Sequence, residues 1–544
     1  MCTYTHTRAP DPVGRFVGLR PVNVRPAKWL ARPPSPFTAM YTMYRNAHRQ
    51  KSSSHPKNSH QQTQSQSQIE DGAHILGRSK KAQTYDQAIF SLSIPAVLAM
   101  ATDPLLQLVD TIFVGTGPGS GGSNALAALG VTSSLLTFAF VTFNFLATAT
   151  TPLVATALAS GDAARAGKVT VQAFTLASTL GVLLTVLLMV TSDTALLWVG
   201  QESVRENSDV FSLAKDFLLI RAIGAPASLL MTVGQGVFRG LQDTKTPLTI
   251  TLAANGVNLA LDIALILGLG LGVRGAGIAT LSAEMFAAVS YVSLLWTRHR
   301  DVLGITVNGG NYSGRSLWLR WLRETIGLKA IAPFFAAGGA MLMRTALLLG
   351  TKTLASASAA RLGPEAVAGH HIVMQLWMLS SLIIDSLAVA GQSLVATELG
   401  VGNLGDARGV ASRLMQLGML TGGVMAVALF LVEPQCIGLF THDDKVREYV
   451  ESIYPLAVGM LPLNALVYVL DGILVGARDF TWMAGAMIFA AATSGALLTT
   501  VAQADDGLGL KGVWVALTVL MASRLVALVW RYIDGPLAER SPDV

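Results

Sequence analysis

The sequence predicts an all-α polytopic membrane protein with 12 transmembrane helices in two six-helix, pseudo-symmetric lobes. Three observations carry this prediction. The 544-residue chain is 51% apolar and only 13% charged, with a mean hydropathy of +0.50. It contains twelve apolar runs of helix length, and motifs from its first half recur in its second half. Because a soluble domain carries about 25% charged residues, this composition excludes an ordinary soluble protein.

Each apolar run is long enough to cross a bilayer as a helix. A helical crossing needs roughly 20 apolar residues, whereas a barrel strand needs only about 10. Backbone groups in lipid must pair within their own segment, so these runs should be helices. The predicted spans are 88–115, 127–157, 169–192, 213–238, 246–270, 275–297, 329–350, 365–397, 410–431, 447–475, 481–502 and 511–532.

Three motifs occur in the same order in both halves of the chain. The aligned pairs are PLVATALASGDAARAGKV (152–169) with SLVATELGVGNLGDARGV (393–410), GVFRGLQD (236–243) with GILVGARD (472–479), and GVRGAGIA (272–279) with GLKGVWVA (509–516). Six spans per half is an even number, so both halves should enter the membrane from the same side, as parallel repeats. The expected parts are an N-lobe (85–297), a linker (298–328), a C-lobe (329–532) and a C-terminal tail (533–544).

Residues 1–84 lack apolar periodicity and should form a disordered, basic N-terminal tail. Residues 1–68 hold ten Lys/Arg and one acidic residue, so the net positive charge of the chain belongs to this tail, and no folded basic module for nucleic acid is indicated. Its Arg- and Ser-rich, acid-poor composition resembles an organelle transit peptide. The alternatives are a cytosolic tail and a gene model that begins upstream of Met40. The plastid envelope and the plasma membrane therefore both stay open.

The distribution of Lys and Arg orients the spans. With the N-terminus inside, the inner loops carry fifteen Lys/Arg and the outer loops eight, as expected for an inner side. Both chain ends then face the inside. The sequon at Asn311 also lies inside, where it should not be glycosylated.

Ionisable side chains inside membrane spans are costly and usually functional. The candidates are Asp103, Asp110, Arg221, Asp262, Glu284, Arg344, Asp385, Asp471 and Arg524. In the fifth span, Asn255, Asn258 and Asp262 are spaced three and four residues apart and share one helix face. A polar face on an apolar helix should look into the helix bundle.

Asp110 lies in the first span, in the stretch LQLVDTIFVG, and Asp103 precedes it by seven residues on the same face. Pro95 and Pro104 should interrupt and bend this helix. A carboxyl group shielded from water takes up a proton more readily, and Asn258 and Thr280 could hydrogen-bond it. The pattern predicts a proton site or a Na⁺ site built from oxygen ligands. The absence of a richer oxygen cluster favours H⁺. The structural alternative is a neutral Asp that caps a helix or pairs with Arg221.

In the second half, Arg344 and Asp385 are mid-helix and of opposite charge. They form either an interhelical ion pair or, with Asn255, part of a substrate cavity. Asp471, Glu284 and Arg524 are interpreted as packing or interface groups. His370 and His371 are adjacent, so they point about 100° apart on a helix and make a poor metal chelate. We expect a polar pair at an interface or a cavity, and no metal site.

Motifs for catalysis or nucleotide hydrolysis are missing from the sequence. GDAARAGKV has five residues between its glycines and Val169 where a phosphate loop needs Ser or Thr. No GxSxG or HExxH occurs. We therefore expect no enzyme activity, no cofactor and no direct use of ATP.

Several stretches resemble the multidrug and toxic compound extrusion (MATE) transporters. SIPAVLAMATDPLLQLVDTIFVG followed by ALAALGV resembles their first-helix region. GVFRGLQDTKTPL, NGVNLALDIALILGLGLGVRGAGIAT, and QLWMLSSLIIDSLAVAGQSLVA with VASRLMQLGML resemble the DinF-like branch, and the last two look closest to its plant members. The resemblance covers roughly 85–532. It implies the MATE fold and efflux of a solute in exchange for H⁺ or Na⁺.

The resemblance carries over residue by residue in the N-lobe. It implies that Asp110 is the first-helix carboxylate, Asn258 and Asp262 the fifth-helix pair, and Thr280 their sixth-helix neighbour. Asp103 departs from the pattern, since a neutral residue is expected there, and this puts the number of titrating groups in doubt. Plant relatives in this branch include exporters of citrate and other organic anions, and plastid-envelope members.

These observations predict a monomeric secondary antiporter in the lipid bilayer, exporting a drug, a metabolite or an organic anion such as citrate. Protonation of Asp262 and Asp110 would reshape the first helix and release substrate outward. The alternative within the same two-lobe superfamily is a lipid-linked oligosaccharide flippase. Such a flippase should need a more positively charged central cavity than Arg221 and Arg344 supply. A channel or receptor is a remote alternative. The sequence does not name the substrate.

Overall fold

The structure is a computed structural model that describes residues 65–116, 122–205, 208–299, 328–441, 443–501 and 509–538. Within these ranges the chain is built from helices without strands, which confirms the predicted all-α class. Leu76–Val544 forms one compact unit, distinct from the unit Met1–Ile75. Most of the predicted tail and linker, with the Asn311 sequon, lies outside the described residues. The predicted lobe boundaries remain predictions.

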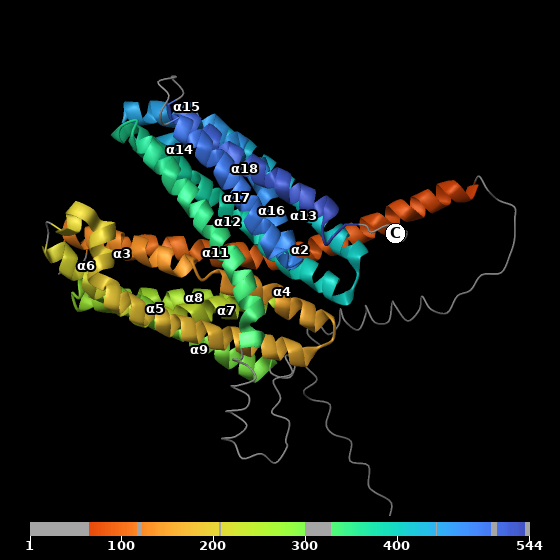
Figure 1. Cartoon of the computed structure of the whole chain (residues 1–544), viewed down its shortest axis with the longest axis horizontal. Coiled ribbons are helices and arrows are strands. Elements are labelled where there is room, and N and C mark those ends of the chain that lie inside the picture. The colour runs from red at the N-terminus through yellow and green to blue at the C-terminus, as the bar shows by residue number, and fades with distance from the viewer. Residues whose placement is uncertain are drawn as a thin grey trace, which may run out of the picture. The chain divides into compact units, whose positions relative to one another are not determined.

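The helices of the first half form one bundle, drawn from orange to green in Figure 1. They are α2 (Ser65–Thr116), α3 (Ser123–Val141), α4 (Phe145–Ala159), α5 (Ala163–Arg205), α6 (Ser208–Ile223), α7 (Ala225–Gly240), α8 (Lys245–Asp262), the π-helix η1 (Ile263–Gly268), α9 (Gly272–Leu294) and the π-helix η2 (Leu295–His299). α2 begins at Ser65, so the last part of the predicted tail is helical.

The helices of the second half form another bundle, drawn from green to blue. They are α11 (Leu328–Ala360), α12 (Pro364–Val401), α13 (Leu404–Leu431), α14 (Glu433–Phe440), α15 (Asp444–Gly459), α16 (Leu461–Gly476), α17 (Phe480–Val501) and α18 (Gly509–Asp534). Each predicted span thus corresponds to a helix or to two consecutive helices.

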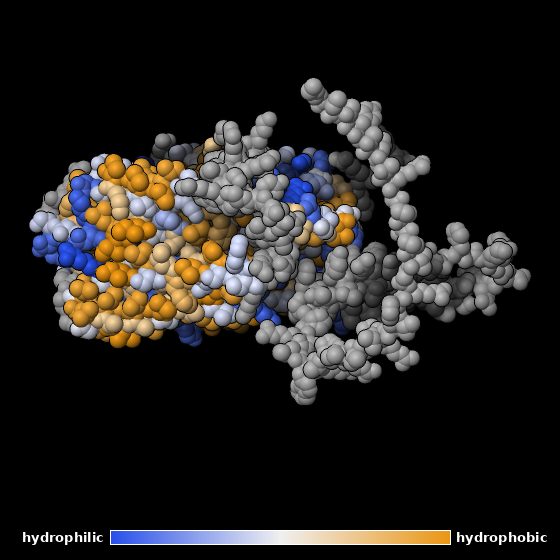
Figure 2. Space-filling view, turned by 90° about the horizontal axis from the view of Figure 1, so that it is seen from below, coloured by the Kyte–Doolittle hydropathy of each residue, from blue (hydrophilic) through white to orange (hydrophobic). Residues whose placement is uncertain are grey.

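The described residues contain nine to 11 candidate membrane crossings, compared with the 12 predicted from the sequence. Nine helical segments are long and apolar enough to span a membrane, and two bent pairs, α6 with α7 and α15 with α16, bring the count to 11. The predicted seventh span, 329–350, lies within the 33-residue α11, which is not among these candidates. Figure 2 shows apolar side chains over the middle of the visible face and hydrophilic ones toward its ends. A bilayer would cover such a belt, and the chain is a multi-pass membrane protein.

The predicted repeat recurs in the backbone of its turns. Each aligned motif pair places a left-handed residue at the same position: Gly161 and Gly402 (both φ 80°), Gln242 and Arg478 (57° and 60°), and Gly272 and Gly509 (53° and 46°). Positive φ is uncommon in residues other than glycine. Its recurrence at aligned Gln and Arg positions supports two structural repeats.

Two aligned prolines explain the bends in the fourth and tenth spans. Pro226 and Pro462 stand at the second position of α7 and α16, where the bent pairs turn by 50° and 48°. Proline has no N–H to donate and its ring clashes with the carbonyl four residues earlier, so the preceding helix cannot continue straight through it. Hydropathy alone predicted one continuous span for each bent pair, because both helices of each pair are apolar.

The expectation that Pro95 and Pro104 interrupt the first span is wrong, because α2 runs through both. Pro95 leaves the carbonyl of Ser91 without its helical donor. The Thr244 hydroxyl, at the start of α8, donates to the carbonyl of Leu92 at 2.9 Å and reaches that of Ser91 at 3.5 Å. A hydroxyl from a neighbouring helix therefore satisfies backbone groups near the proline, as membrane helices allow.

The two halves contact each other at the ends predicted to be inner. α4 packs against α12 and α11. Gln242 Nε2 donates to Thr397 Oγ1 at 2.9 Å, and Ser393 Oγ donates to the carbonyl of Arg239 at 2.7 Å. Gln242 follows α7 and Thr397 lies near the end of α12. These contacts close the space between the halves on the predicted inner side.

Candidate functional site

α8 places two of its three predicted polar residues fully inside the first-half bundle. Asn258 and Asp262 are 0% exposed, whereas Asn255, one turn earlier, is half-buried. Asp262 is the last residue of α8, and the π-helix η1 follows it directly. Single π-turns of this kind are frequent at functional sites. The helix therefore changes from α to π directly after the residue that carries the buried carboxylate.

The carboxyl groups of Asp110 on α2 and Asp262 on α8 lie close enough to interact with each other. A carboxylate only accepts hydrogen bonds, so a bond between two carboxyl groups requires a proton on one of them. Asp262 Oδ1 has no hydrogen-bond partner among the described residues. The structure therefore brings together the two carboxyl groups that the sequence and the resemblance predicted to form a pair.

Asn258 joins this pair to α9. With its amide nitrogen turned toward Asp262, Nδ2 donates to Asp262 Oδ2 at 2.7 Å and the amide oxygen accepts from the Thr280 N–H at 3.1 Å. In the opposite orientation, Nδ2 donates to Thr280 Oγ1 at 3.3 Å. The orientation of the amide is assigned from its hydrogen bonds. We assign the first orientation, because it gives the amide nitrogen an acceptor and the amide oxygen a donor. The structure thus brings Asp110, Asn258, Asp262 and Thr280 together.

A second charged group lies beside the carboxyl pair. Arg221 Nη2 on α6 donates to Glu284 Oε1 on α9 at 2.8 Å, and Arg221 is close enough to Asp110 to interact with it electrostatically. The Arg221 guanidinium also lies 5.8 Å from the centre of the Phe140 ring. The ion-pair partner of Arg221 is therefore Glu284, and the sequence-based alternative that pairs an Asp directly with Arg221 is not what the structure has.

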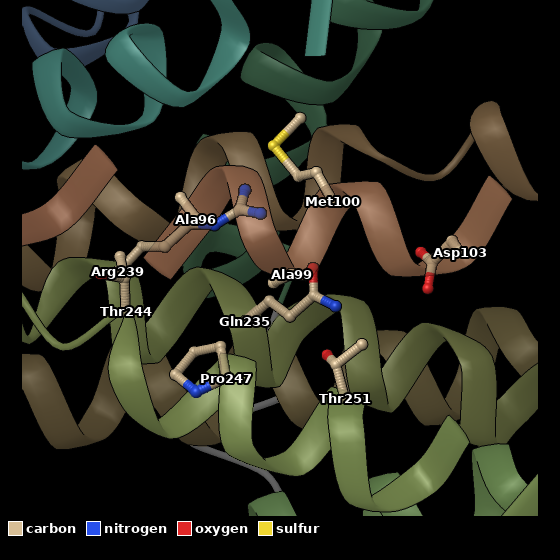
Figure 3. A pocket seen from close by; sticks show the side chains of 9 residues that line it. All are labelled: Ala96, Ala99, Met100, Asp103, Gln235, Arg239, Thr244, Pro247 and Thr251. Carbon is tan, nitrogen blue, oxygen red and sulfur yellow. The ribbon is translucent and has the colours of Figure 1, made fainter. Parts of the chain in front are cut away.

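Asp103, itself exposed, lines a small cavity of mixed polar and apolar character between α2, α7 and α8, on the inner side of the pair (Figure 3). The cavity has a volume of about 50 Å³. Its lining residues are Ala96, Ala99, Met100, Asp103, Gln235, Arg239, Thr244, Pro247 and Thr251. In Figure 3 Gln235 and Thr251 lie near the centre of the view, and Asp103 lies to their right. Gln235 and Arg239 are not among the residues predicted from the sequence.

The second half has its own charged cluster, but with different pairing from that predicted. Asp471 Oδ2 on α16 accepts from Arg344 on α11 and from Arg524 on α18. Asp471 and Arg524 are buried, and the Arg344 side chain is 20% exposed. Of the two interpretations of Arg344 and Asp385, the direct ion pair is not what the structure has, because Arg344 and Arg524 both donate to Asp471 on α16.

Asp385 on α12 interacts electrostatically with Arg344, Asp471, Arg239 and Arg524 without an ion pair to Arg344. It lies between the two halves, since Arg239 belongs to the first. His370 is fully buried, with Nε2 3.2 Å from Ser356 Oγ and its ring 5.8 Å from that of Trp514. His370 thus packs inside the helix bundle and His371 is exposed, whereas the sequence predicted a polar pair at an interface or a cavity.

Comparison with known proteins places most of the membrane region in one family. A model of the MatE family matches residues 95–264 and 340–501. Protein DETOXIFICATION 44, chloroplastic, of Arabidopsis thaliana is 35% identical over 453 residues, with 81% of each chain covered. The DNA damage-inducible protein F of Escherichia coli is 28% identical over 449 residues, covering 82% of this chain and 92% of that relative.

The fold likeness is equally broad. A solved structure described as the outward-facing conformation of a multidrug resistance MATE family transporter of the MOP superfamily superposes with a TM-score of 0.70 at 20% identity. It covers 84% of this chain and 97% of its own. The two matched segments of the family model include Asp110 and Asp262 in the first half and Arg344 and Asp385 in the second. The predicted resemblance is confirmed, and the chain belongs to the MATE family of multidrug and toxic compound extrusion transporters.

Proposed function

We propose that this transporter is a secondary antiporter that exports a small organic solute in exchange for H⁺, with coupling at the Asp110–Asp262 pair. The observation that carries the proposal is the proximity of these two carboxyl groups on different helices, with Asp262 fully buried and its Oδ1 without a partner among the described residues. A proton shared by the pair allows the two carboxyl groups to hydrogen-bond, and loss of that proton leaves two carboxylates whose like charges push α2 and α8 apart. A proton is thus coupled to the relative position of two helices.

The surroundings favour H⁺ over Na⁺ as the coupling ion. A hard metal cation such as Ca²⁺ takes six to eight oxygen ligands. At this site the Asn258 amide bonds to both Asp262 and Thr280, and the Thr280 hydroxyl donates to the carbonyl of Ala276 at 2.9 Å. Few oxygens stay available besides the two carboxyl groups. Two carboxyl groups sharing a proton need no further ligand.

In the proposed cycle, the carboxyl pair takes up protons from the outer side and α2 moves relative to α8. This movement changes the cavity between the halves and releases substrate outward. Proton release to the inner side resets the cavity for the next substrate. No step requires ATP, and one chain contains both halves, so a monomer suffices.

For the substrate, the second half favours an organic anion such as citrate over an organic cation. Arg344 and Arg524 share the single counter-charge of Asp471. The nearby Lys352 ammonium lies 4.6 Å from the centre of the Trp377 ring. This part of the described chain therefore has one more cation than anions, since it contains two arginines and one lysine but only Asp471 and Asp385. A carboxylate substrate would neutralise the excess and could bind an arginine in a bidentate manner.

The proposed location is the plastid envelope. The relative DETOXIFICATION 44 is named chloroplastic, and the N-terminal tail has the Arg- and Ser-rich composition of a transit peptide. Imaging of fluorescent fusions with and without residues 1–84 tests this. Loss of plastid targeting on deletion supports it, and plasma-membrane localisation of the full chain contradicts it.

The function is tested by transport into vesicles under an imposed pH gradient, with a panel that contains citrate and an organic cation. Accumulation of citrate that needs the pH gradient, and is indifferent to a Na⁺ gradient, is expected. Accumulation driven by Na⁺ alone would overturn proton coupling. Accumulation of the cation instead of citrate would keep the antiport and overturn the substrate class.

A further inference from the structure

We infer that Asp103 and the cavity it lines form an inner access route for protons, with Asp103 relaying protons between the inner side and the Asp110–Asp262 pair. This inference rests on the proposed proton coupling and adds the path by which the coupling site reaches the inner side. Asp103 acts here as a relay residue that neither binds substrate nor belongs to the coupling pair.

The position of Asp103 along α2 is the first argument. It precedes Asp110 by seven residues, which is two helical turns and about 10 Å nearer the inner end on the same helix face. The two carboxyl groups are too far apart for a direct hydrogen bond. A proton that travels between them needs intermediate groups, and the structure supplies such groups on both sides of Asp103.

On the inner side, the intermediate is the cavity itself. Its volume of about 50 Å³ is enough for a few water molecules, since one needs about 10–15 Å³ of such space and two to four polar partners. Gln235 and Thr251 line it together with Asp103 (Figure 3), and Arg239 and Thr244 extend its lining toward the inner end of α7. Water held by these groups would link Asp103 to the inner end of the bundle.

On the outer side, the intermediate is the Arg221–Glu284 pair. Glu284 interacts electrostatically with Asp103, and Arg221 with Asp110. Glu284 Oε1 accepts a hydrogen bond from Arg221, while Glu284 Oε2 is buried without a partner among the described residues. That oxygen can accept a hydrogen bond from a protonated Asp103 or from a bridging water. Charged and polar groups therefore continue from the cavity to the coupling pair.

The charged and titratable groups that face Asp103 come from each neighbouring helix. α9 contributes Glu284 and Tyr291, whose hydroxyl lies beside Thr251, and α7 contributes Arg239. In one passage the pair loses the proton that Asp103 gains, and Asp103 then gives it to cavity water. Asp103 returns to its starting state, and the pair stays one proton short until it is protonated again from the outer side. No oxidation or covalent step is involved.

The inner end of this route is closed in the present conformation. Thr244 lines the cavity, is 4% exposed, and donates its hydroxyl to the Leu92 carbonyl at 2.9 Å. On the same side the two halves are joined by Gln242 and Thr397. The route would therefore open to inner water only when the halves separate there, which keeps protons from leaking while the outer side is accessible.

The experiment uses the proton itself as probe. The full chain is reconstituted with known orientation, a pH step is applied to one side, and time-resolved infrared spectroscopy follows the carboxyl C=O band that is lost in Asp262→Asn. For Asp103→Asn we expect at least a tenfold slower response to a step on the inner side and an unchanged response to an outer step. Asp103→Glu should restore the inner response, and the exposed Asp193→Asn should leave both unchanged.

If Asp103→Asn responds to an inner pH step as fast as the unmodified protein does, the relay role of Asp103 is wrong. If Asp103→Asn does not reach the membrane, Gln235→Leu keeps the carboxylate, makes the cavity apolar, and is expected to slow the inner response alone. A different result would overturn the proposed coupling at the Asp110–Asp262 pair: neither Asp262→Asn nor Asp110→Asn would then change the carboxyl band.

Discussion

Asp86, near the inner end of the membrane-spanning part of α2, accepts two hydrogen bonds from Arg413 on α13, from Nε at 2.6 Å and from Nη2 at 2.7 Å. One residue earlier, the Tyr85 hydroxyl donates to Asp406 Oδ1 at 2.8 Å. These contacts join the helix that carries Asp110 to the opposite half of the transporter. We call this group of four residues the inner latch.

Loss of the inner latch should favour separation of the halves on the inner side. Asp86 and Arg413 have side chains 27% and 32% exposed, so a bidentate pair there contributes about 1 kcal/mol. Arg413→Ala should therefore raise the inward-open to outward-open ratio roughly fivefold. Spin labels at the exposed Arg165 and Val401, at the inner ends of α5 and α12, should then show a larger share of long distances. Arg447→Ala, which breaks a pair within α15, is the control. An unchanged distance distribution in Arg413→Ala would contradict this role.

Gly422 on α13 should tolerate no side chain, whereas its neighbour Gly423 should. A Cβ at Gly422 would lie 2.8 Å from the Cα of Pro462 and from the Cβ of Ala465, at the bend of the tenth span, while a Cβ at Gly423 meets nothing within 4 Å. Overpacking of this kind costs about 1–3 kcal/mol. Gly422→Ala should lower the thermal transition of the detergent-solubilised protein, and Gly423→Ala should leave it within error. Equal transitions for the two variants would mean that α13 and α16 do not pack this closely.

Removal of Asp471 should destabilise the second half strongly. Its carboxylate is the counter-charge of Arg524, which is 2% exposed, and of Arg344. Loss of one partner from a buried charge pair costs about 3–5 kcal/mol, because the other charge stays uncompensated. Asp471→Asn should show this as a large drop in thermal stability, and adding Arg524→Met should recover part of it. If the single variant is as stable as the unmodified protein, these arginines have another counter-charge.

The sequence predicts most of this architecture because membrane spans obey one dominant rule. The approximate number of spans follows from hydropathy. The location of Asn258 and Asp262 on one helix face follows from their spacing of four residues. The meeting of Asp110 with Asp262 is different, since it depends on how α2 packs against α8 and came from the family resemblance. Spacing along one helix does not contain that information.

The errors have the same origin. Arg344 pairs with Asp471 instead of Asp385 because the choice between two acids depends on which helix faces α11. Asp86 and Arg413 lie 327 residues apart and outside or at the edge of the apolar runs, so no local pattern connects them. The unbroken course of α2 through Pro95 depends on a hydroxyl from α8, Thr244, that only tertiary packing supplies.

The central claim is that protonation of the Asp110–Asp262 pair drives export. The most direct test is solute transport by Asp262→Asn in proteoliposomes under an imposed pH gradient, with the amount of protein in the membrane measured in the same vesicles. Asparagine keeps the shape of the side chain but cannot exchange a proton. We predict normal membrane insertion and loss of gradient-driven transport. Transport by Asp262→Asn at the rate of the unmodified protein would contradict the proposed mechanism.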